Sequence, residues 1–96
     1  MAIRILTPAQ QVTVLSDGVQ DLLDGGVVLP GGGNALTTKL DAALSLLDNG
    51  NIQGAIGKLK DFINQVENYI KTGKLTSRQG QPLIDAAQAL IIELGG

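Results

Sequence analysis

The most constraining feature of the sequence is a set of apolar residues spaced three or four apart between positions 52 and 70. Its members are Ile52, Ile56, Leu59, Ile63, Val66 and Ile70. This spacing places them on one narrow face of an α-helix. A helix with such a face is stable when the face is buried against other apolar elements. The segment therefore predicts a helix over about 52–71 that packs into a shared core.

Three further segments show the same spacing and are bounded by residues typical of helix ends. Thr7 and Pro8 favour a helix start, because the hydroxyl can cap a free amide and proline needs no amide in the first turn. These segments predict helices over about 8–24, 31–48 and 77–94. Their apolar stripes are Val12, Leu15, Val19, Leu22 and Leu23; Leu36, Leu40, Ala43, Leu44 and Leu47; and Leu83, Ala87, Leu90, Ile91 and Leu94.

Strand signals are nearly absent from the sequence. Only the stretch IRIL, residues 3–6, reads as a strand, and it is too short to form a sheet alone. Short connections between the predicted helices favour antiparallel neighbours. We therefore expect an all-α module of four antiparallel helices over 7–96, built as two similar helical hairpins. Residues 1–6 are expected to be a linker or a segment added by cloning.

The two halves of the sequence resemble each other. Shifting the chain by 47 residues sets Gly33 on Gly80, and it superposes identical residues that lie on the apolar stripes or in loops. In a duplicated helical hairpin, identical residues are expected at these core and loop positions, so the pattern predicts an internal repeat. The other superposed pairs are Val19 with Val66, Gly26 with Gly73, Leu36 with Leu83, Ala42 with Ala89, and Leu47 with Leu94.

Pro82 stands a few residues inside the last predicted helix. Thr76 and Gln79 form a capping-box pattern, so a helical turn is expected from Ser77. A proline after that turn removes the backbone hydrogen bond to the Arg78 carbonyl. Pro82 is therefore interpreted as the mark of a bend or of a delayed start of the main helix, and a functional hinge is the competing interpretation.

Composition excludes several kinds of function. The chain has no histidine and no cysteine, which removes the usual general base, the cysteine nucleophiles and the common zinc sites. Seven Lys and Arg are scattered among nine Asp and Glu, so no basic stripe is available for nucleic acid. No apolar run approaches the roughly 20 residues that cross a bilayer. We expect no catalytic, metal or cofactor residue, no nucleic-acid partner and no membrane insertion.

Three patterns look like ligand sites but have simpler explanations. Asp17, Asp21 and Asp24 share one face of the first predicted helix, as carboxylates on a solvated face also do. The stretch DNGN, 48–51, fails the calcium-loop pattern because the twelfth position is not Glu. The stretch PGGGN, 30–34, lacks the Lys-Ser/Thr ending and the preceding strand of a phosphate loop.

Three longer sequence segments occur in a specific order and spacing along the chain. They are NALTTKLDAAL (34–44), AIGKLKDFINQV (55–66) and GQPLIDAA (80–87). Together they resemble the FIMAH domain, a helical module of bacteria and archaea found at the C-terminal end of large secreted or surface proteins. The resemblance covers about Thr7 to Leu94. One departure is Gly57, where the family more often has Asn.

The resemblance implies a non-catalytic accessory module that is extracellular or on the cell surface. Its expected role is protein–protein interaction or spacing at the end of a larger protein, with another protein or other domains of the parent chain as partner. The alternative is a carbohydrate-binding accessory domain of a secreted enzyme, and a small hydrolase using carboxylates is a third reading. The oligomeric state is left open.

Four residues of the third predicted helix are candidate partner contacts: Phe62, Asn64, Gln65 and Tyr69. Phe62 and Tyr69 are the aromatic residues of the chain and would serve a sugar site, but both flank the apolar stripe, so core packing competes. Asn64 lies about 150° from the centre of the stripe, which core packing does not explain. It is expected to contact a partner or a loop, or to be a neutral surface residue. Gln65 lies nearer the flank and could hydrogen-bond a loop.

Overall fold

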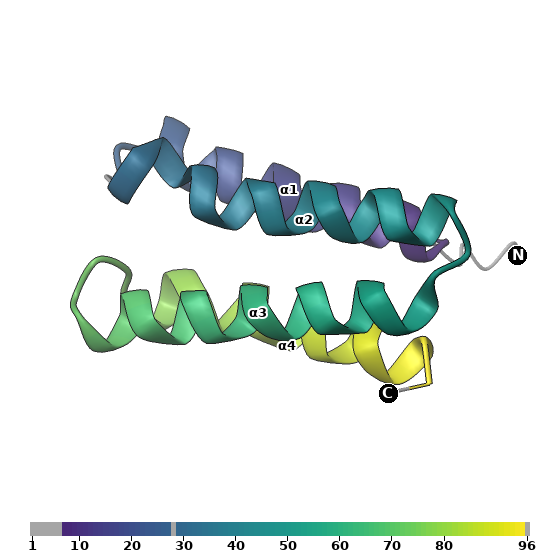
Figure 1. The fold of residues 1–96 in the computed structure, drawn as a ribbon. Helices are drawn as coiled ribbons and strands as arrows, with labels where there is room; N and C mark the ends of the chain where they lie inside the picture. Colours follow the sequence, from purple (N-terminus) through teal and green to yellow (C-terminus); the bar gives the residue numbers. More distant parts are fainter. Residues whose placement is uncertain (1–6, 28, 96) are drawn as a thin grey trace, which may run out of the picture.

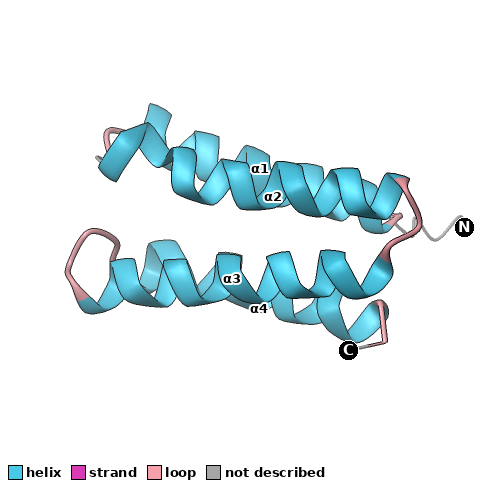
Figure 2. Ribbon diagram, in the orientation of Figure 1, coloured by secondary structure: helices cyan, strands magenta, loops and turns pink. Residues whose placement is uncertain are grey.

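The structure, a computed structural model, describes residues 7–27 and 29–95. This described part forms four α-helices and one short 3₁₀ turn, and it contains no strand (Figures 1 and 2). The expected all-α class is confirmed. The segment 1–6, including IRIL, lies outside the described residues. The elements are α1 (Pro8–Asp24), η1 (Pro30–Gly33), α2 (Asn34–Asp48), α3 (Ile52–Lys71) and α4 (Ser77–Glu93).

The helices form two layers, with α1 and α2 in one and α3 and α4 in the other (Figure 1). Each helix contacts the next one along the chain, and α4 contacts α1 to close a ring. Within the described residues, the diagonal pairs α1 with α3 and α2 with α4 make no such contact. This arrangement is consistent with two helical hairpins packed face to face.

Capping boxes fix the starts of α1 and α4. The Gln10 amide donates to the Thr7 hydroxyl over 3.1 Å, and the Thr7 amide donates to the Gln10 side chain over 2.9 Å. Thr76 and Gln79 make the same reciprocal pair, at 3.2 and 2.9 Å. These bonds satisfy amides that the first helical turn leaves without partners. The two helix starts are therefore set by local sequence, as expected.

The start of the second helix differs from the prediction. The expected helix over 31–48 is divided into the 3₁₀ turn η1 and α2, which begins at Asn34. Gly33 has a φ of 81°, in the left-handed region that favours glycine. This conformation interrupts the right-handed backbone between η1 and α2, so the two segments cannot form one regular helix.

Pro82 lies inside α4, which runs without interruption from Ser77 to Glu93. The delayed start that the sequence suggested is therefore not observed. The capping box at Thr76 holds the first turn in helical form, and that turn precedes the amide that Pro82 lacks. The Pro82 side chain is exposed, so its ring does not contribute to the core.

The core is built from apolar side chains of all four α-helices. Phe62 is the largest of the fully buried side chains, and no polar or charged residue of the described part is buried. Leu29 and Leu75 also belong to the core although they lie in connections, just ahead of η1 and α4. The rest of the buried set is Val12, Leu15, Val19, Leu36, Leu40, Ala43, Ala55, Ile56, Leu59, Ile63, Val66, Tyr69, Leu83, Ile84, Ala87, Leu90 and Ile91.

Candidate functional site

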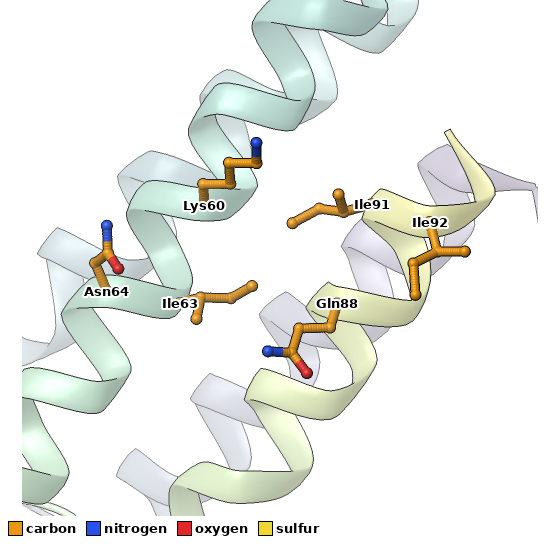
Figure 3. A pocket seen from close by; sticks show the side chains of 6 residues that line it. All are labelled: Lys60, Ile63, Asn64, Gln88, Ile91 and Ile92. Atoms are coloured by element: carbon orange, nitrogen blue, oxygen red, sulfur yellow. The ribbon is translucent and has the colours of Figure 1, made fainter. Parts of the chain in front are cut away.

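The candidate site is a hollow on the outer side of the seam between α3 and α4. It has a volume of about 450 Å³, and both helices line it (Figure 3). Helical spacing explains the lining, because residues at i, i+3 and i+4 share one face of a helix. Each helix supplies one such trio. The trios are Lys60, Ile63 and Asn64 from α3, and Gln88, Ile91 and Ile92 from α4.

The floor of this hollow is apolar. The side chains of Ile63 and Ile91 point toward each other across the seam (Figure 3) and are almost completely buried. Ile92 stands at the edge and is 73% exposed, more than any other large apolar side chain of the described part. An isoleucine in this position leaves apolar surface in water beside an apolar floor. Such a combination is a candidate contact surface for another molecule.

The rim of the hollow is polar. Asn64 and Gln88 are both exposed, and neither side chain makes a hydrogen bond within the described residues. Lys60 is also exposed and has no acidic partner among these residues. The rim therefore offers an ammonium group and two amides, whose N–H groups can all donate to an incoming molecule.

A second hollow continues along the same seam toward the other end of the helix pair. It has a volume of about 260 Å³ and is lined by Glu67, Ile70, Lys71, Ser77, Gln81 and Ile84. Ile70 and Ile84 extend the apolar floor, so isoleucines recur along the whole seam. We call the two hollows together the α3–α4 groove.

A separate hollow of about 330 Å³ lies between α1 and α4. It is lined by Gln11, Val14, Ala86 and Ala89. Gln11 donates a side-chain hydrogen bond to the Glu93 carboxylate, which links the two helices at this edge. Val14 is 53% exposed and lies outside the α3–α4 groove. It therefore provides a matched control position for experiments on Ile92.

The structure separates the four residues that the sequence singled out. Asn64 lines the α3–α4 groove, and it makes no hydrogen bond to a loop of the described part. Gln65 is half-buried on α3 and does not line the groove, and it too makes no such bond. Phe62 is 0% exposed and Tyr69 is 3% exposed, because both complete the core face of α3. The two aromatic rings therefore offer no surface to a partner.

Sequence reasoning missed most of the groove. Ile92 was the available signal, because it lies beside the stripe of α4 and adds an apolar residue that the stripe does not need. Lys60 and Gln88 carry no such signal. Their significance depends on how α3 and α4 are placed relative to each other, which spacing along one helix does not reveal.

The acidic residues of α1 lie apart from the groove. Asp17, Asp21 and Asp24 are exposed on α1. The described residues contain no group of three or more acidic, histidine or cysteine side chains placed to hold a metal ion. Among those same residues, no helix combines the length and the hydropathy needed to cross a membrane.

Comparison with known proteins gives one family. Searches of curated proteins and of solved structures returned no significant match. The model of the FIMAH domain family matches residues 12–92. This match begins in α1 and ends in the last turn of α4, so it includes nearly all of the helical structure and both sides of the α3–α4 groove. The chain belongs to the FIMAH domain family.

Proposed function

We propose that this domain is a non-catalytic accessory module that binds another protein, or another domain of its parent chain, through the α3–α4 groove. Its place is outside the cell or on the cell surface, in keeping with the surface proteins that the family suggests. The observation that carries the proposal is Ile92, which is 73% exposed at the edge of an apolar floor.

The composition of the groove supports protein binding. Burying an isoleucine side chain that was exposed to water contributes about 1.5–3 kcal/mol. The amides of Asn64 and Gln88 surround this apolar centre and can fix the orientation of the bound molecule. An apolar centre with a polar rim is the usual anatomy of a protein interface. A groove between two helices also suits the apolar face of an amphipathic helix.

Carbohydrate binding receives less support. A sugar site commonly presents the flat face of an aromatic ring, and the Phe62 and Tyr69 rings are buried in the core. The exposed side chains of the α3–α4 groove are one isoleucine, three amides, two lysines, Glu67 and Ser77, and none of them is aromatic. The groove is therefore better suited to an apolar protein surface than to a sugar ring.

We also infer that the two hairpins are repeats of one unit. The ends of α1 and α3, Asp24 and Lys71, differ by the same 47 residues that align the sequence. η1 spans 30–33, and the same offset places the first turn of α4 at 77–80. The outer faces differ nonetheless, because the groove isoleucines at 63, 84 and 92 have Ser16, Thr37 and Ser45 as their counterparts in the first hairpin. The groove is thus a property of the second hairpin.

A capture experiment tests the proposed function. Immobilised domain is exposed to the secreted proteins of its native host, with the Ile92→Glu variant as the test and the Val14→Glu variant as the matched control. We expect wild type and Val14→Glu to retain the same protein, and Ile92→Glu to lose it, because a carboxylate at the edge disrupts an apolar contact. Both variants change exposed positions, so the free energy of unfolding, measured by thermal unfolding, should change by less than about 0.5 kcal/mol. Equal retention by the wild type and both variants would show that the groove is not the binding site.

A further inference from the structure

We propose that the α3–α4 groove binds the acidic outer face of α1 and α2 from a second copy of this chain. This inference rests on the proposed function, because it identifies the partner of the same groove. The acidic face is defined by the exposed carboxylates of α1 and α2, which are Asp17, Asp21, Asp24, Asp41 and Asp48.

The two hairpins differ strongly in charge. Residues 7–51 carry these five carboxylates and a single basic residue, Lys39, so the first hairpin is acidic. Residues 52–95 carry five basic residues and four acidic ones, so the second hairpin is slightly basic. The groove itself is lined by two lysines, Lys60 and Lys71, and by one carboxylate, Glu67. Opposite charge on two faces of one molecule favours a contact in which unlike faces meet. A contact between two α1–α2 faces would instead bring carboxylates together.

The two surfaces are also complementary in their hydrogen-bonding groups. The repeat offset of 47 residues sets Asn64 on Asp17 and Gln88 on Asp41, so the first hairpin carries carboxylates where the second carries amides. The groove supplies N–H donors from these amides and from Lys60, and carboxylates are acceptors. Leu23 and Leu44 are half-buried on the same helices as the carboxylates, and they provide apolar surface for Ile92.

The layer arrangement determines the type of assembly. The acidic face belongs to one layer and the α3–α4 groove to the other, so the two surfaces lie on opposite sides of the molecule (Figure 1). A contact between unlike surfaces is heterologous, and it leaves a free groove at one end of a pair and a free acidic face at the other. The assembly can therefore grow beyond a dimer, because a further copy can bind at the free groove or at the free acidic face.

The contact area limits how strong this association can be. A helix of the length of α3 is about 30 Å long, and a face of two packed helices is about 20 Å wide, because each helix occupies about 10 Å. These dimensions give a footprint of about 600 Å² on each copy. The total of about 1,200 Å² is at the lower end for stable protein interfaces. We therefore expect weak and reversible association, visible at high protein concentration or where copies are held close together.

Sedimentation equilibrium tests the inference, with protein concentrations rising to about 1 mM. The average mass of the wild type should increase with concentration and pass the dimer mass. The dissociation constant of self-association should be several-fold lower at low salt than at about 0.5 M salt, because high salt screens the attraction between unlike charges. The Ile92→Glu variant should remain monomeric, and the Val14→Glu control should associate like the wild type. A wild type that stays monomeric at every concentration would overturn the inference.

A mixing experiment distinguishes unlike from like faces. The Ile92→Glu variant lacks a working groove but keeps its acidic face, whereas the Asp17→Lys/Asp41→Lys variant lacks the acidic face but keeps its groove. Each should be monomeric alone, and an equal mixture should form a one-to-one dimer that grows no further. Dimers of the Asp17→Lys/Asp41→Lys variant alone would instead show a groove-to-groove contact and contradict the proposal.

The outcomes also separate this inference from the proposed function. If the wild type stays monomeric while the capture of a different secreted protein depends on Ile92, the second copy is the wrong partner and the groove remains a binding site. If neither self-association nor capture depends on Ile92, both proposals fail.

Discussion

Replacing Phe62 with alanine should lower the free energy of unfolding by about 3–5 kcal/mol. Phe62 is fully buried and is the largest side chain with that degree of burial, so its loss opens a cavity among residues of several helices. A domain of this size has a total stability of about 5–15 kcal/mol, so the variant should be marginally folded. The measurement is the midpoint of urea unfolding, followed by circular dichroism.

The conservative change Phe62→Leu provides the control. It keeps most of the apolar volume, and it should therefore cost less than the alanine variant. A loss below about 1 kcal/mol for Phe62→Ala would mean that the ring is not at the centre of the core. Phe62→Ala is therefore unsuitable as a test of carbohydrate binding, because loss of binding in this variant would result from unfolding.

Replacing Gly80 with alanine should destabilise the domain by about 1–3 kcal/mol, although alanine is the better helix former. A β-carbon at this position would lie 2.6 Å from Ile70 Cδ1, 2.9 Å from Ile70 Cγ1 and 3.1 Å from Val66 Cγ1. Val66 is fully buried and Ile70 packs against the core, so the added methyl group requires these side chains to repack or α4 to shift away from α3. The absence of a side chain at Gly80 thus permits the close contact of the two helices that form the groove.

Gly57 is the matched control for this prediction. It is also a glycine inside a helix, but a β-carbon there would meet no atom within 4 Å. Gly57→Ala should therefore raise stability by about 0.5–1 kcal/mol through helix propensity alone. Thermal unfolding of the two variants should shift in opposite directions. An increase in the melting temperature for Gly80→Ala would show that the helices are not in close contact at this point.

Double substitution locates the cause of the Gly80 effect. Ile70→Ala removes the atoms nearest to the added β-carbon, so it should cost less in the Gly80→Ala background than in the wild type. Independent effects would add instead. This coupling tests a contact between α3 and α4 that the sequence pattern does not contain.

The sequence predicts the helices well because each one carries its own spacing and its own end signals. Thr7 and Thr76 start their helices through contacts only three residues long, so local sequence is sufficient there. Leu29 and Leu75 were missed as core residues because they lie in connections, where no helical period places them on a face. Their burial follows from the packing of the layers.

The candidate site also combines features that the local sequence predicts with features that depend on tertiary packing. Asn64 was recognisable as an outward residue from its angle on α3, and it does line the groove. Phe62 and Tyr69 could be assigned to the core or to a partner until their burial was known. Ile92 and Gln88 gain their significance only from the position of α4 beside α3, which is a tertiary property.

We propose that this FIMAH domain binds protein through the α3–α4 groove. The most direct measurement is a map of amide chemical-shift changes in the labelled domain, recorded with the protein that the capture experiment retains, or with unlabelled domain if that protein is a second copy. We expect one cluster of changes, centred on Lys60, Asn64, Gln88 and Ile92. Changes centred instead on Val14 and Ala89, with the groove residues unaffected, would contradict it.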